Sequence, residues 1–376
     1  MNQLAKMAVV LVAIGSMHSI GWAQAKDAWP MYRGNGLGTG VANSTLPKNP
    51  QLLWKYEVKE GAFDATPAIV DGVVYIGDLD GTFYAFDLKQ GGEPKWTYKV
   101  KDSGFPGSAA IKDGLAYIGD YYGVLHCVDI KTGKKKWTYE ANAEINGSPN
   151  FFKDQVLFGS QDANLYCLNA KTGKLEWNLM IQDQIQSAPT IVDGKCFLAG
   201  CDGKLHIVDV NRGEEISSVG INDPTTVTPA ALGDNIYFGT EGGVLFSVNW
   251  RKSEVNWYYE DAKSFQSIRS SPAVTKKGVI FGSRSRKVYC VHPETGKLIW
   301  KQPVRRNVDA SVVISGDRAY VGVTDGRLLA FNIEDGSLEW QYQGRGAFNE
   351  SPAIAENKLV IASGDGIVYC FGKKDK

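Results

Sequence analysis

The feature that most constrains the fold is a segment that returns eight times along the chain. Its clearest copy runs from Thr66 to Asp87 and is followed by Trp96. Successive copies are spaced by 42, 40, 40, 40, 43, 40 and 40 residues, and they begin at Thr66, Ser108, Ser148, Ala188, Thr228, Ser271, Ser311 and Ser351. A period this constant is typical of propeller blades or solenoid turns.

Each copy contains three runs of β-branched and aromatic residues, followed by a fourth run that carries a tryptophan. In the first copy, Asp71-Gly72 separates strand A (66–70) from strand B (73–76), and Asp80-Gly81 separates strand B from strand C (83–87). Asp-Gly pairs favour tight hairpins, because glycine accepts positive φ angles. The repeat therefore predicts four-stranded antiparallel blades, A to D, in an all-β propeller.

The two ends of the chain indicate how many blades there are. The last copy ends near Gly372 without a tryptophan strand, whereas an isolated strand around Trp54 (52–58) precedes the first copy. We expect this N-terminal strand to complete the C-terminal blade, giving one eight-bladed domain over 51–372 and a charged tail over 373–376. Closure removes the free sheet edges, and we expect a monomer.

The first 25 residues have the features of a cleavable signal peptide. Lys6 precedes an apolar stretch (7–15), and Ala23-Gln-Ala25 offers small residues at a cleavage site. No cysteine lies near this site, and the apolar stretch is too short for a spanning anchor. We therefore expect a periplasmic or secreted protein without a transmembrane segment. A glycine-rich leader (26–50) follows, and we expect it to pack over one face and to be dispensable for ring closure.

Charge and composition exclude several classes of function. Basic and acidic residues number 41 each, so no global field attracts nucleic acid or anionic lipid. The Asp-Gly turns lack the remaining ligands of a calcium loop, so we predict no metal site. His126 and His206 occupy a strand C position that holds tyrosine in other copies, and we expect them in the core.

Four of the six cysteines share one position on strand C, where other copies carry mostly small apolar residues. We expect these four to be buried free thiols: Cys127, Cys167, Cys290 and Cys370. Cys196 and Cys201 lie five residues apart, and a disulfide between them is a second possibility. The sequence has no Cys-x-x-Cys pattern typical of zinc or redox sites.

A short motif precedes the tryptophans at fixed offsets. It combines an Asp or Asn with Thr-Gly and Trp, as in Asp129, Thr132-Gly133 and Trp137. This motif resembles the tryptophan-docking motif of PQQ-like (quinoprotein-type) eight-bladed propellers, in which the indole docks between blades. The corresponding tryptophans are Trp54, Trp96, Trp137, Trp177, Trp257, Trp300 and Trp340. Blade 4 carries Ser217 instead, and we predict that its seam is the weakest.

The resemblance implies two different functions. Some members of the family are dehydrogenases of alcohols or sugars that hold pyrroloquinoline quinone (PQQ) with calcium, and others, the BamB-like outer-membrane assembly factors, bind proteins without a cofactor. The dehydrogenases carry adjacent cysteines and long inserts, and this chain has neither. The sequence therefore favours a BamB-like, non-catalytic scaffold without a cofactor, with the quinoprotein dehydrogenase as the alternative.

A ring of polar residues lies two positions before the start of each strand A. Because these positions converge on the axis, we expect them to line an axial funnel: Asp64, Asn146, Gln186, Thr226, Arg269, Asp309 and Asn349, with Pro106 in blade 2. Behind it runs a mostly apolar ring, from Phe63 to Phe348, that could form a pocket. The polar ring either hydrates the channel mouth or binds a small molecule.

Arginine is distributed unevenly, with eight of eleven between residues 269 and 345. The D–A and B–C connections share one face of a propeller, and seven of these arginines are expected in one sector of it: Arg269, Arg284, Arg286, Arg305, Arg306, Arg327 and Arg345. Blades 1 to 4 offer aspartates on the same face, among them Asp64, Asp78, Asp80, Asp102, Asp120, Asp162, Asp183 and Asp202. The guanidinium fork suits bidentate capture of anions, so we predict a protein or anionic polymer partner there; a solvated charged rim is the alternative.

Overall fold

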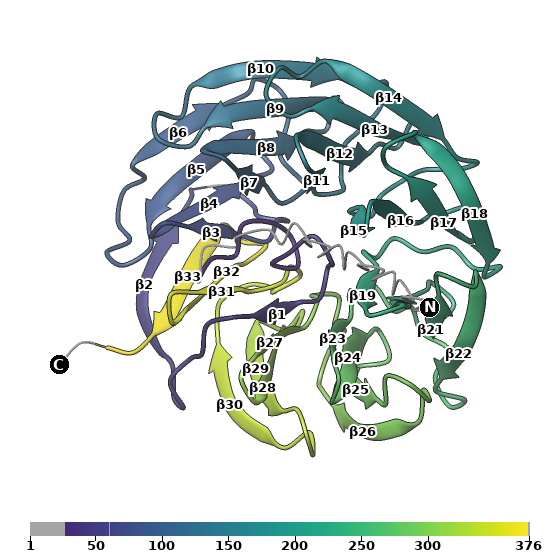
Figure 1. Ribbon diagram of the computed structural model, residues 1–376. Coiled ribbons are helices and arrows are strands. Elements are labelled where there is room, and N and C mark those ends of the chain that lie inside the picture. The colour runs from purple at the N-terminus through teal and green to yellow at the C-terminus, as the bar shows by residue number, and fades with distance from the viewer. Residues whose placement is uncertain (1–26, 60, 375–376) are drawn as a thin grey trace, which may run out of the picture.

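The computed structural model describes residues 27–59 and 61–374, so the predicted signal peptide lies outside the described residues. Eight sheets surround a central axis, as Figure 1 shows, and the predicted eight-bladed all-β propeller is confirmed. In every blade the described strands run antiparallel from the axis outward. Within this part of the chain, no helix has the length and apolarity needed to cross a membrane.

The first four blades follow one another along the chain. Their strands are β3 (Ala68–Val70), β4 (Val73–Gly77), β5 (Thr82–Asp87) and β6 (Trp96–Lys99) in blade 1; β7 (Ala110–Lys112), β8 (Leu115–Gly119), β9 (Val124–Asp129) and β10 (Lys135–Glu140) in blade 2; β11 (Asn150–Phe152), β12 (Gln155–Gly159), β13 (Asn164–Asn169) and β14 (Leu175–Met180) in blade 3; and β15 (Thr190–Val192), β16 (Lys195–Ala199), β17 (Lys204–Asp209) and β18 (Glu214–Gly220) in blade 4.

Blades 5 to 7 repeat this order, and blade 8 takes its outer strand from the N-terminal side. Their strands are β19 (Ala230–Leu232), β20 (Asn235–Gly239), β21 (Val244–Asn249) and β22 (Glu254–Glu260) in blade 5; β23 (Ala273–Thr275), β24 (Gly278–Ser283), β25 (Lys287–Val291) and β26 (Leu298–Pro303) in blade 6; β27 (Val313–Ser315), β28 (Arg318–Gly322), β29 (Arg327–Asn332) and β30 (Leu338–Gln343) in blade 7; and β31 (Ala353–Ala355), β32 (Lys358–Ala362), β33 (Ile367–Gly372) and β2 (Gln51–Glu57) in blade 8.

The pairing of β2 with β33 confirms the predicted closure of the ring. Trp54 lies opposite Cys370 in this antiparallel pair. Its indole Nε1 donates a hydrogen bond to the carbonyl of Leu88 in blade 1 at 3.0 Å. The N-terminal strand therefore joins blade 8 and also docks onto blade 1.

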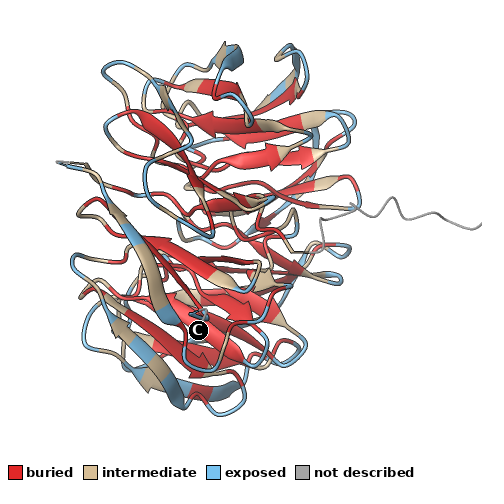
Figure 2. Ribbon diagram, turned by 90° about the vertical axis from the view of Figure 1, so that its left-hand side faces the viewer, coloured by how far each residue is buried: buried red, intermediate tan, exposed pale blue. Residues whose placement is uncertain are grey.

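The core consists of the seams between neighbouring blades. Figure 2 shows buried residues throughout the inner strands and exposed residues in the turns and outermost strands. The apolar ring from Phe63 to Phe348 is buried in these seams, so its side chains fill the space behind the funnel. Phe105, for example, is fully buried and packs on Gly77 of blade 1, where an added Cβ would lie 2.5 Å from its side chain.

The docking tryptophans share one geometry. Six of them donate from Nε1 to a backbone carbonyl of the following blade, at 2.9–3.2 Å: Trp54, Trp96, Trp137, Trp177, Trp257 and Trp300. Each ring covers a glycine of that blade, such as Gly133 under Trp96. Trp340 instead packs edge-on against Phe371. Most of these indoles are half-buried, because they lie at the outer rim of the seam.

The seam between blades 4 and 5 departs from this geometry in a compensated way. Ser217 replaces the tryptophan and Ser253 replaces the glycine, and their hydroxyls are 2.8 Å apart. Trp250 of blade 5 reaches across the seam instead and meets Phe197 of blade 4 edge-on, with ring centroids 5.7 Å apart. A tryptophan from the opposite blade thus takes the place of the missing indole, and a groove of about 240 Å³ remains beside it.

The leader (27–50) forms a strap across one end of the central channel, visible as the purple segment inside the ring in Figure 1. In six blades, the N–H of the same strand A residue donates to a strap carbonyl at 2.7–2.9 Å; the donors are Ile69, Ile111, Ile191, Ala231, Val274 and Ile314. Asn150 of blade 3 donates its Nδ2 to Gly36, and in blade 8 the N–H of Asn357 donates to Ser44. The strap therefore contacts all eight blades, and it adds β1 (Val41–Ala42) in parallel to β27.

Two buried side chains fix the strap. Trp29 is 1% exposed and packs against Gly34, whose φ of 81° brings the backbone close to the ring. Arg33 is fully buried and donates from Nη2 to the carbonyls of Pro272 and Val312. Burial lowers the pKa of Arg33 to about 10. The glycine-rich composition of the leader thus serves close backbone packing.

Candidate functional site

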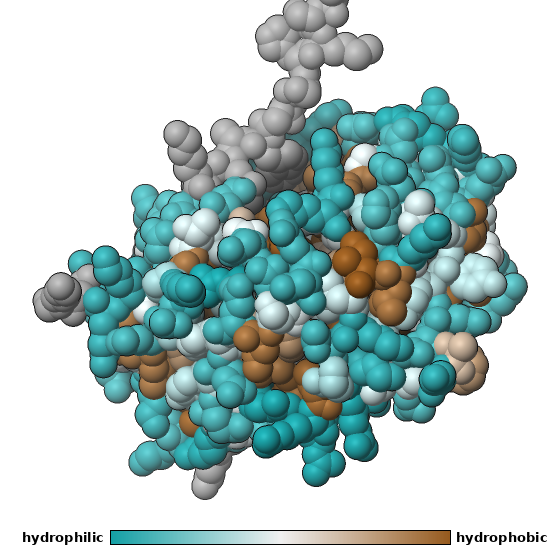
Figure 3. Space-filling view, turned by 90° about the horizontal axis from the view of Figure 1, so that it is seen from below, coloured by the Kyte–Doolittle hydropathy of each residue, from teal (hydrophilic) through white to brown (hydrophobic). Residues whose placement is uncertain are grey.

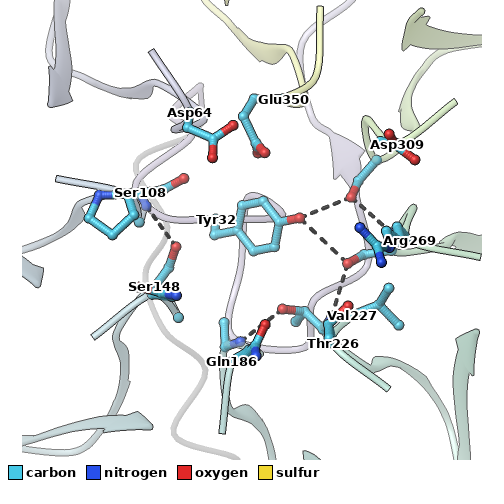
Figure 4. Close-up of a pocket in the computed structure, with 18 residues that line it drawn as sticks. Tyr32, Asp64, Ser108, Ser148, Gln186, Thr226, Val227, Arg269, Asp309 and Glu350 are labelled. Atoms are coloured by element: carbon cyan, nitrogen blue, oxygen red, sulfur yellow. Dashed lines mark hydrogen bonds between the residues drawn. The ribbon is translucent and has the colours of Figure 1, made fainter. Parts of the chain in front are cut away.

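An axial cavity of about 200 Å³ opens where the eight A strands begin. Its wall is made by the residues immediately before and at each strand start, and Tyr32 of the strap forms its floor. Figure 4 shows the Tyr32 ring in the middle of the cavity, with its hydroxyl 2.9 Å from Ser311 Oγ. Among the described residues, the strap crosses the channel below the cavity, and the cavity lies on the side of the D–A and B–C connections.

The structure brings six of the seven predicted funnel residues together around this cavity: Asp64, Asn146, Gln186, Thr226, Arg269 and Asp309. Asn349 is not among the lining residues, and its neighbour Glu350 takes that place. Sequence reasoning missed Glu350 and Tyr32. Glu350 precedes its strand start at a position that is small or apolar in all other blades, and this departure from the repeat is the signal that could have identified it.

A circle of hydroxyl groups supports the wall from below. The backbone N–H at a strand start donates to the Ser or Thr hydroxyl at the next strand start, at 2.9–3.1 Å, in six of the eight seams. The circle is interrupted at Ala188, which has no hydroxyl. It is also interrupted at Thr66, whose buried Oγ1 has no partner among the described residues.

Charges on the cavity wall are distributed in two groups. On one side, Arg284 donates from Nε and Nη2 to the two carboxylate oxygens of Asp309 at 2.8 and 3.0 Å, and Arg269 pairs with Glu241. On the other side, Asp64 and Glu350 have no cationic partner among the residues that the structure describes. Burial raises the pKa of Glu350 well above its usual range, and the charges of Asp64 and Asp309 raise it further. The unpaired ionisable groups of the cavity among the described residues are therefore carboxyl groups, and burial also raises the pKa of Asp64.

We expect Glu350→Gln to stabilise the protein at pH 8 and to leave its stability unchanged near pH 3.5. A carboxyl group with a raised pKa in the folded state destabilises that state only when it is ionised, so its cost is absent below the ordinary glutamate value of about 4.3 and appears as the pH rises. Denaturant unfolding across this pH range measures the difference. In an Asp64→Asn background the gain should shrink, because one repelling charge is gone; an equal gain at both pH values contradicts the assignment.

The seven predicted arginines of the loop face fall into two classes. Four form ion pairs with carboxylates of the same chain: Arg269 with Glu241, Arg284 with Asp309, Arg327 with Asp325, and Arg345 with Glu57 and Asp365. The other three, Arg286, Arg305 and Arg306, are exposed and have no carboxylate partner among the described residues. The predicted basic sector is thus smaller than the sequence indicated.

The predicted acidic half of this face is wrong for several of its aspartates. Asp78 and Asp120 are buried, and each accepts two backbone N–H bonds inside its own B–C turn. Asp162 and Asp202 also accept bonds within their turns. Because the N–H groups of their own turns occupy these carboxylates, they shape hairpins.

The predictions for cysteine and histidine are confirmed. Cys127, Cys167, Cys290 and Cys370 are buried and free, and Cys196 and Cys201 are also unpaired. His126 is buried between Asp120 and Tyr98, and His206 lies between Asp202 and Glu215, with nitrogen–oxygen distances of 2.8–3.0 Å. These side chains belong to turn networks away from the cavity.

Comparisons with known proteins agree with this architecture. A family model described as outer membrane protein assembly factor BamB matches residues 47–144, 92–272 and 262–375. BamB of Vibrio cholerae is 25% identical over 134 residues, which cover 32% of this chain and 35% of that protein. Quinohemoprotein alcohol dehydrogenase ADH IIB of Pseudomonas putida is 28% identical over 133 residues, which cover 31% of this chain and 19% of the enzyme. The matches thus span about a third or less of these relatives.

Solved structures show the same fold. BamB from Moraxella catarrhalis superposes with a TM-score of 0.74 at 19% identity, covering 86% of this chain and all of the other. Quinohemoprotein alcohol dehydrogenase from Comamonas testosteroni gives a TM-score of 0.76 at 15% identity, covering 94% of this chain and 82% of the enzyme. At these identities the likeness shows the propeller alone.

Proposed function

The chain belongs to the family described as outer membrane protein assembly factor BamB, and we propose that it is an exported, non-catalytic scaffold that binds another protein of the cell envelope. The binding surface in this proposal is the face formed by the D–A and B–C connections. Fold alone does not select a function, because one propeller hosts both binding proteins and enzymes. The proposal therefore depends on the axial site and on the surface around it.

The observation that carries the proposal is the small axial cavity above the strap. Its volume of about 200 Å³ is below the roughly 300–1,000 Å³ of pockets that enclose drug-sized ligands. Tyr32 lines the cavity from below, and its hydroxyl is hydrogen-bonded to Ser311, so among the described residues this side chain forms the floor. Because the strap crosses the axial channel, we propose that the loops of the D–A/B–C face bind the partner.

A quinoprotein dehydrogenase is the second candidate, favoured by the similarity to the Pseudomonas putida enzyme. The residues at the axis fit PQQ poorly. PQQ is a tricarboxylate, whereas the unpaired ionisable groups of the wall among the described residues are the carboxyl groups of Asp64 and Glu350. Arg269 and Arg284 are already paired with carboxylates. Among the described residues, no cluster of three His, Cys, Asp or Glu side chains is placed to hold a metal ion. These features support a role without the cofactor.

Exposed aromatic residues on the loop face also support protein binding. Tyr122, in the B–C turn of blade 2, is 65% exposed, and Phe265, in the D–A connection before blade 6, is 67% exposed. Large aromatic side chains often anchor protein interfaces. The outer strands at the rim also carry exposed apolar residues, among them Tyr258 at 61%. In Figure 3 the hydrophobic groups form small, separate patches within a hydrophilic surface.

Photo-cross-linking and cofactor titration together test this function. With a photoreactive phenylalanine at Tyr122 in the full chain, we expect a discrete cross-linked protein from envelope extracts, and none from the outer-strand position Leu338, which is 49% exposed. Purified protein mixed with PQQ and calcium should show neither a stoichiometric quinone absorbance band nor dye reduction with alcohols or sugars. Stoichiometric binding with turnover overturns the scaffold proposal in favour of the dehydrogenase.

A further inference from the structure

One B–C turn of the loop face places a long side chain where most blades have glycine. The last residue of each B–C turn adopts a positive φ, and six blades place glycine there: Gly81, Gly123, Gly203, Gly243, Gly326 and Gly366. Blade 3 has Ala163, and blade 6 has Arg286 with φ 59°. A long side chain in left-handed backbone is strained, and such strain is often found at functional sites.

Arg286 lies beside two further unpaired arginines. Its carbonyl accepts the N–H of Val304 at 2.9 Å, so Arg305 and Arg306 follow directly on the neighbouring connection. The nearby carboxylates are already engaged, Asp309 by Arg284 and Asp261 by Lys287 and Lys301. The three exposed guanidinium groups therefore form a local positive surface, which we call the arginine triad.

An exposed aromatic side chain lies on a connection that packs against the B–C turn of Arg286. The connection between blades 5 and 6 lengthens the repeat to 43 residues and carries Phe265. This connection packs on the B–C turn of blade 6, because Ser283 Oγ donates to the carbonyl of Gln266 and the N–H of Arg284 donates to Ser267. Positive charge and an apolar contact thus meet in one sector of the face.

Resting on the proposed scaffold function, we propose that the arginine triad and Phe265 bind an acidic peptide segment that carries an apolar side chain. Guanidinium groups pair with carboxylates in bidentate geometry, and Phe265 supplies the apolar contact. A peptide suits this surface better than a polyuronate such as alginate, which offers carboxylates but no large apolar group for Phe265. Strain at Arg286 is retained because the side chain serves recognition.

Binding is tested with a fluorescein-labelled peptide in which Asp and Glu flank central leucines. The triple variant Arg286→Gly, Arg305→Ser, Arg306→Ser should bind it about tenfold more weakly, the sum expected from three exposed ion pairs. Salt should reduce the affinity of the parent toward that of the variant. Phe265→Ser should weaken peptide binding several-fold and leave alginate binding unchanged. Unchanged peptide affinity in the triple variant overturns the site, and tighter binding of alginate overturns the choice of a peptide.

Stability measurements separate recognition from folding. Arg286→Gly alone should unfold at equal or higher denaturant concentration than the parent, because glycine relieves the strained φ, while its peptide affinity falls. Ala163→Gly is the matched control: it relieves the same turn position in blade 3 and should leave affinity unchanged. If Arg286→Gly lowers stability and affinity together, the arginine is structural and the proposal fails. Persistence of the Tyr122 cross-link in the triple variant would show that the scaffold function survives even when this site is wrong.

Discussion

Replacing Trp29 by alanine is expected to lower the free energy of unfolding by about 3–5 kcal/mol, as large-to-small changes of buried aromatic residues do. Trp29 is 1% exposed, and its backbone exchanges two hydrogen bonds of 2.8 Å with Ile69. Trp29 belongs to a buried cluster that also contains Phe63 and Ile354, at the seam that closes the ring. Loss of this contact should loosen the strap where it enters the channel.

Trp29→Phe is the matched control for this prediction. Because the indole Nε1 of Trp29 has no partner among the described residues, phenylalanine retains most of the packing and loses no hydrogen bond, so its cost should be about 1 kcal/mol. Deletion of residues 27–50 should keep the β-sheet circular dichroism and lower the unfolding midpoint. Wild-type stability of both Trp29→Ala and the deletion would show that the strap does not stabilise the ring.

The architecture could be predicted because the repeat encodes it locally. Hairpin turns such as Asp71-Gly72, with φ angles of 50° and 72°, depend on neighbouring residues only. The isolated strand around Trp54 identified the closure because its missing partner, a blade without a tryptophan strand, was visible in the same sequence. Fold class, blade count and funnel position all follow from aligning the copies of the repeat with one another.

The strap and the charge pairing could not be predicted in the same way. Residues 27–50 belong to no repeat copy, so nothing in the periodicity shows that Ile69 and Ile314 both donate to this segment. Pairing is likewise a property of distance between blades: Arg284 and Asp309 are 25 residues apart and meet only across a seam. Aligning the copies of the repeat placed the seven arginines on one face, but it did not show which of them form ion pairs with carboxylates of the same chain.

The seam between blades 4 and 5 illustrates how a departure from the repeat can be compensated nearby. Ser217 alone indicated a weak seam, since a docking indole is missing. The compensating residue, Trp250, stands where other blades carry Leu88, Ala170 or Val210, and this substitution lies in the next copy of the repeat. Ser217 and Trp250 depart from the repeat in adjacent copies. Comparing the copies one position at a time does not show that these two departures are related.

Replacing Trp250 by alanine is expected to cost about 3–5 kcal/mol, more than the roughly 2 kcal/mol expected for Trp137→Ala at an ordinary seam. Trp250 is 8% exposed and packs on Phe197, whereas Trp137 is half-buried at the rim. Denaturant unfolding of the two variants measures the difference, provided that the free energy of unfolding depends equally on denaturant concentration in both. A smaller loss for Trp250→Ala than for Trp137→Ala would show that Trp250 does not replace the missing indole.

Restoring the common seam tests the same compensation from the other side. Ser217→Trp alone should destabilise by about 1–3 kcal/mol, because Ser253 carries a side chain where the ordinary seams have glycine, and a Cβ added at Gly133 would lie only 2.8 Å from the Trp96 ring. Combined with Trp250→Val and Ser253→Gly, it should recover stability to within about 1 kcal/mol of the parent, since the new indole then gains the glycine surface seen beneath Trp96. The test is whether the changes in unfolding free energy at positions 217 and 250 are non-additive. If the triple variant is no more stable than Trp250→Val with Ser253→Gly, the two tryptophans do not compete for one site.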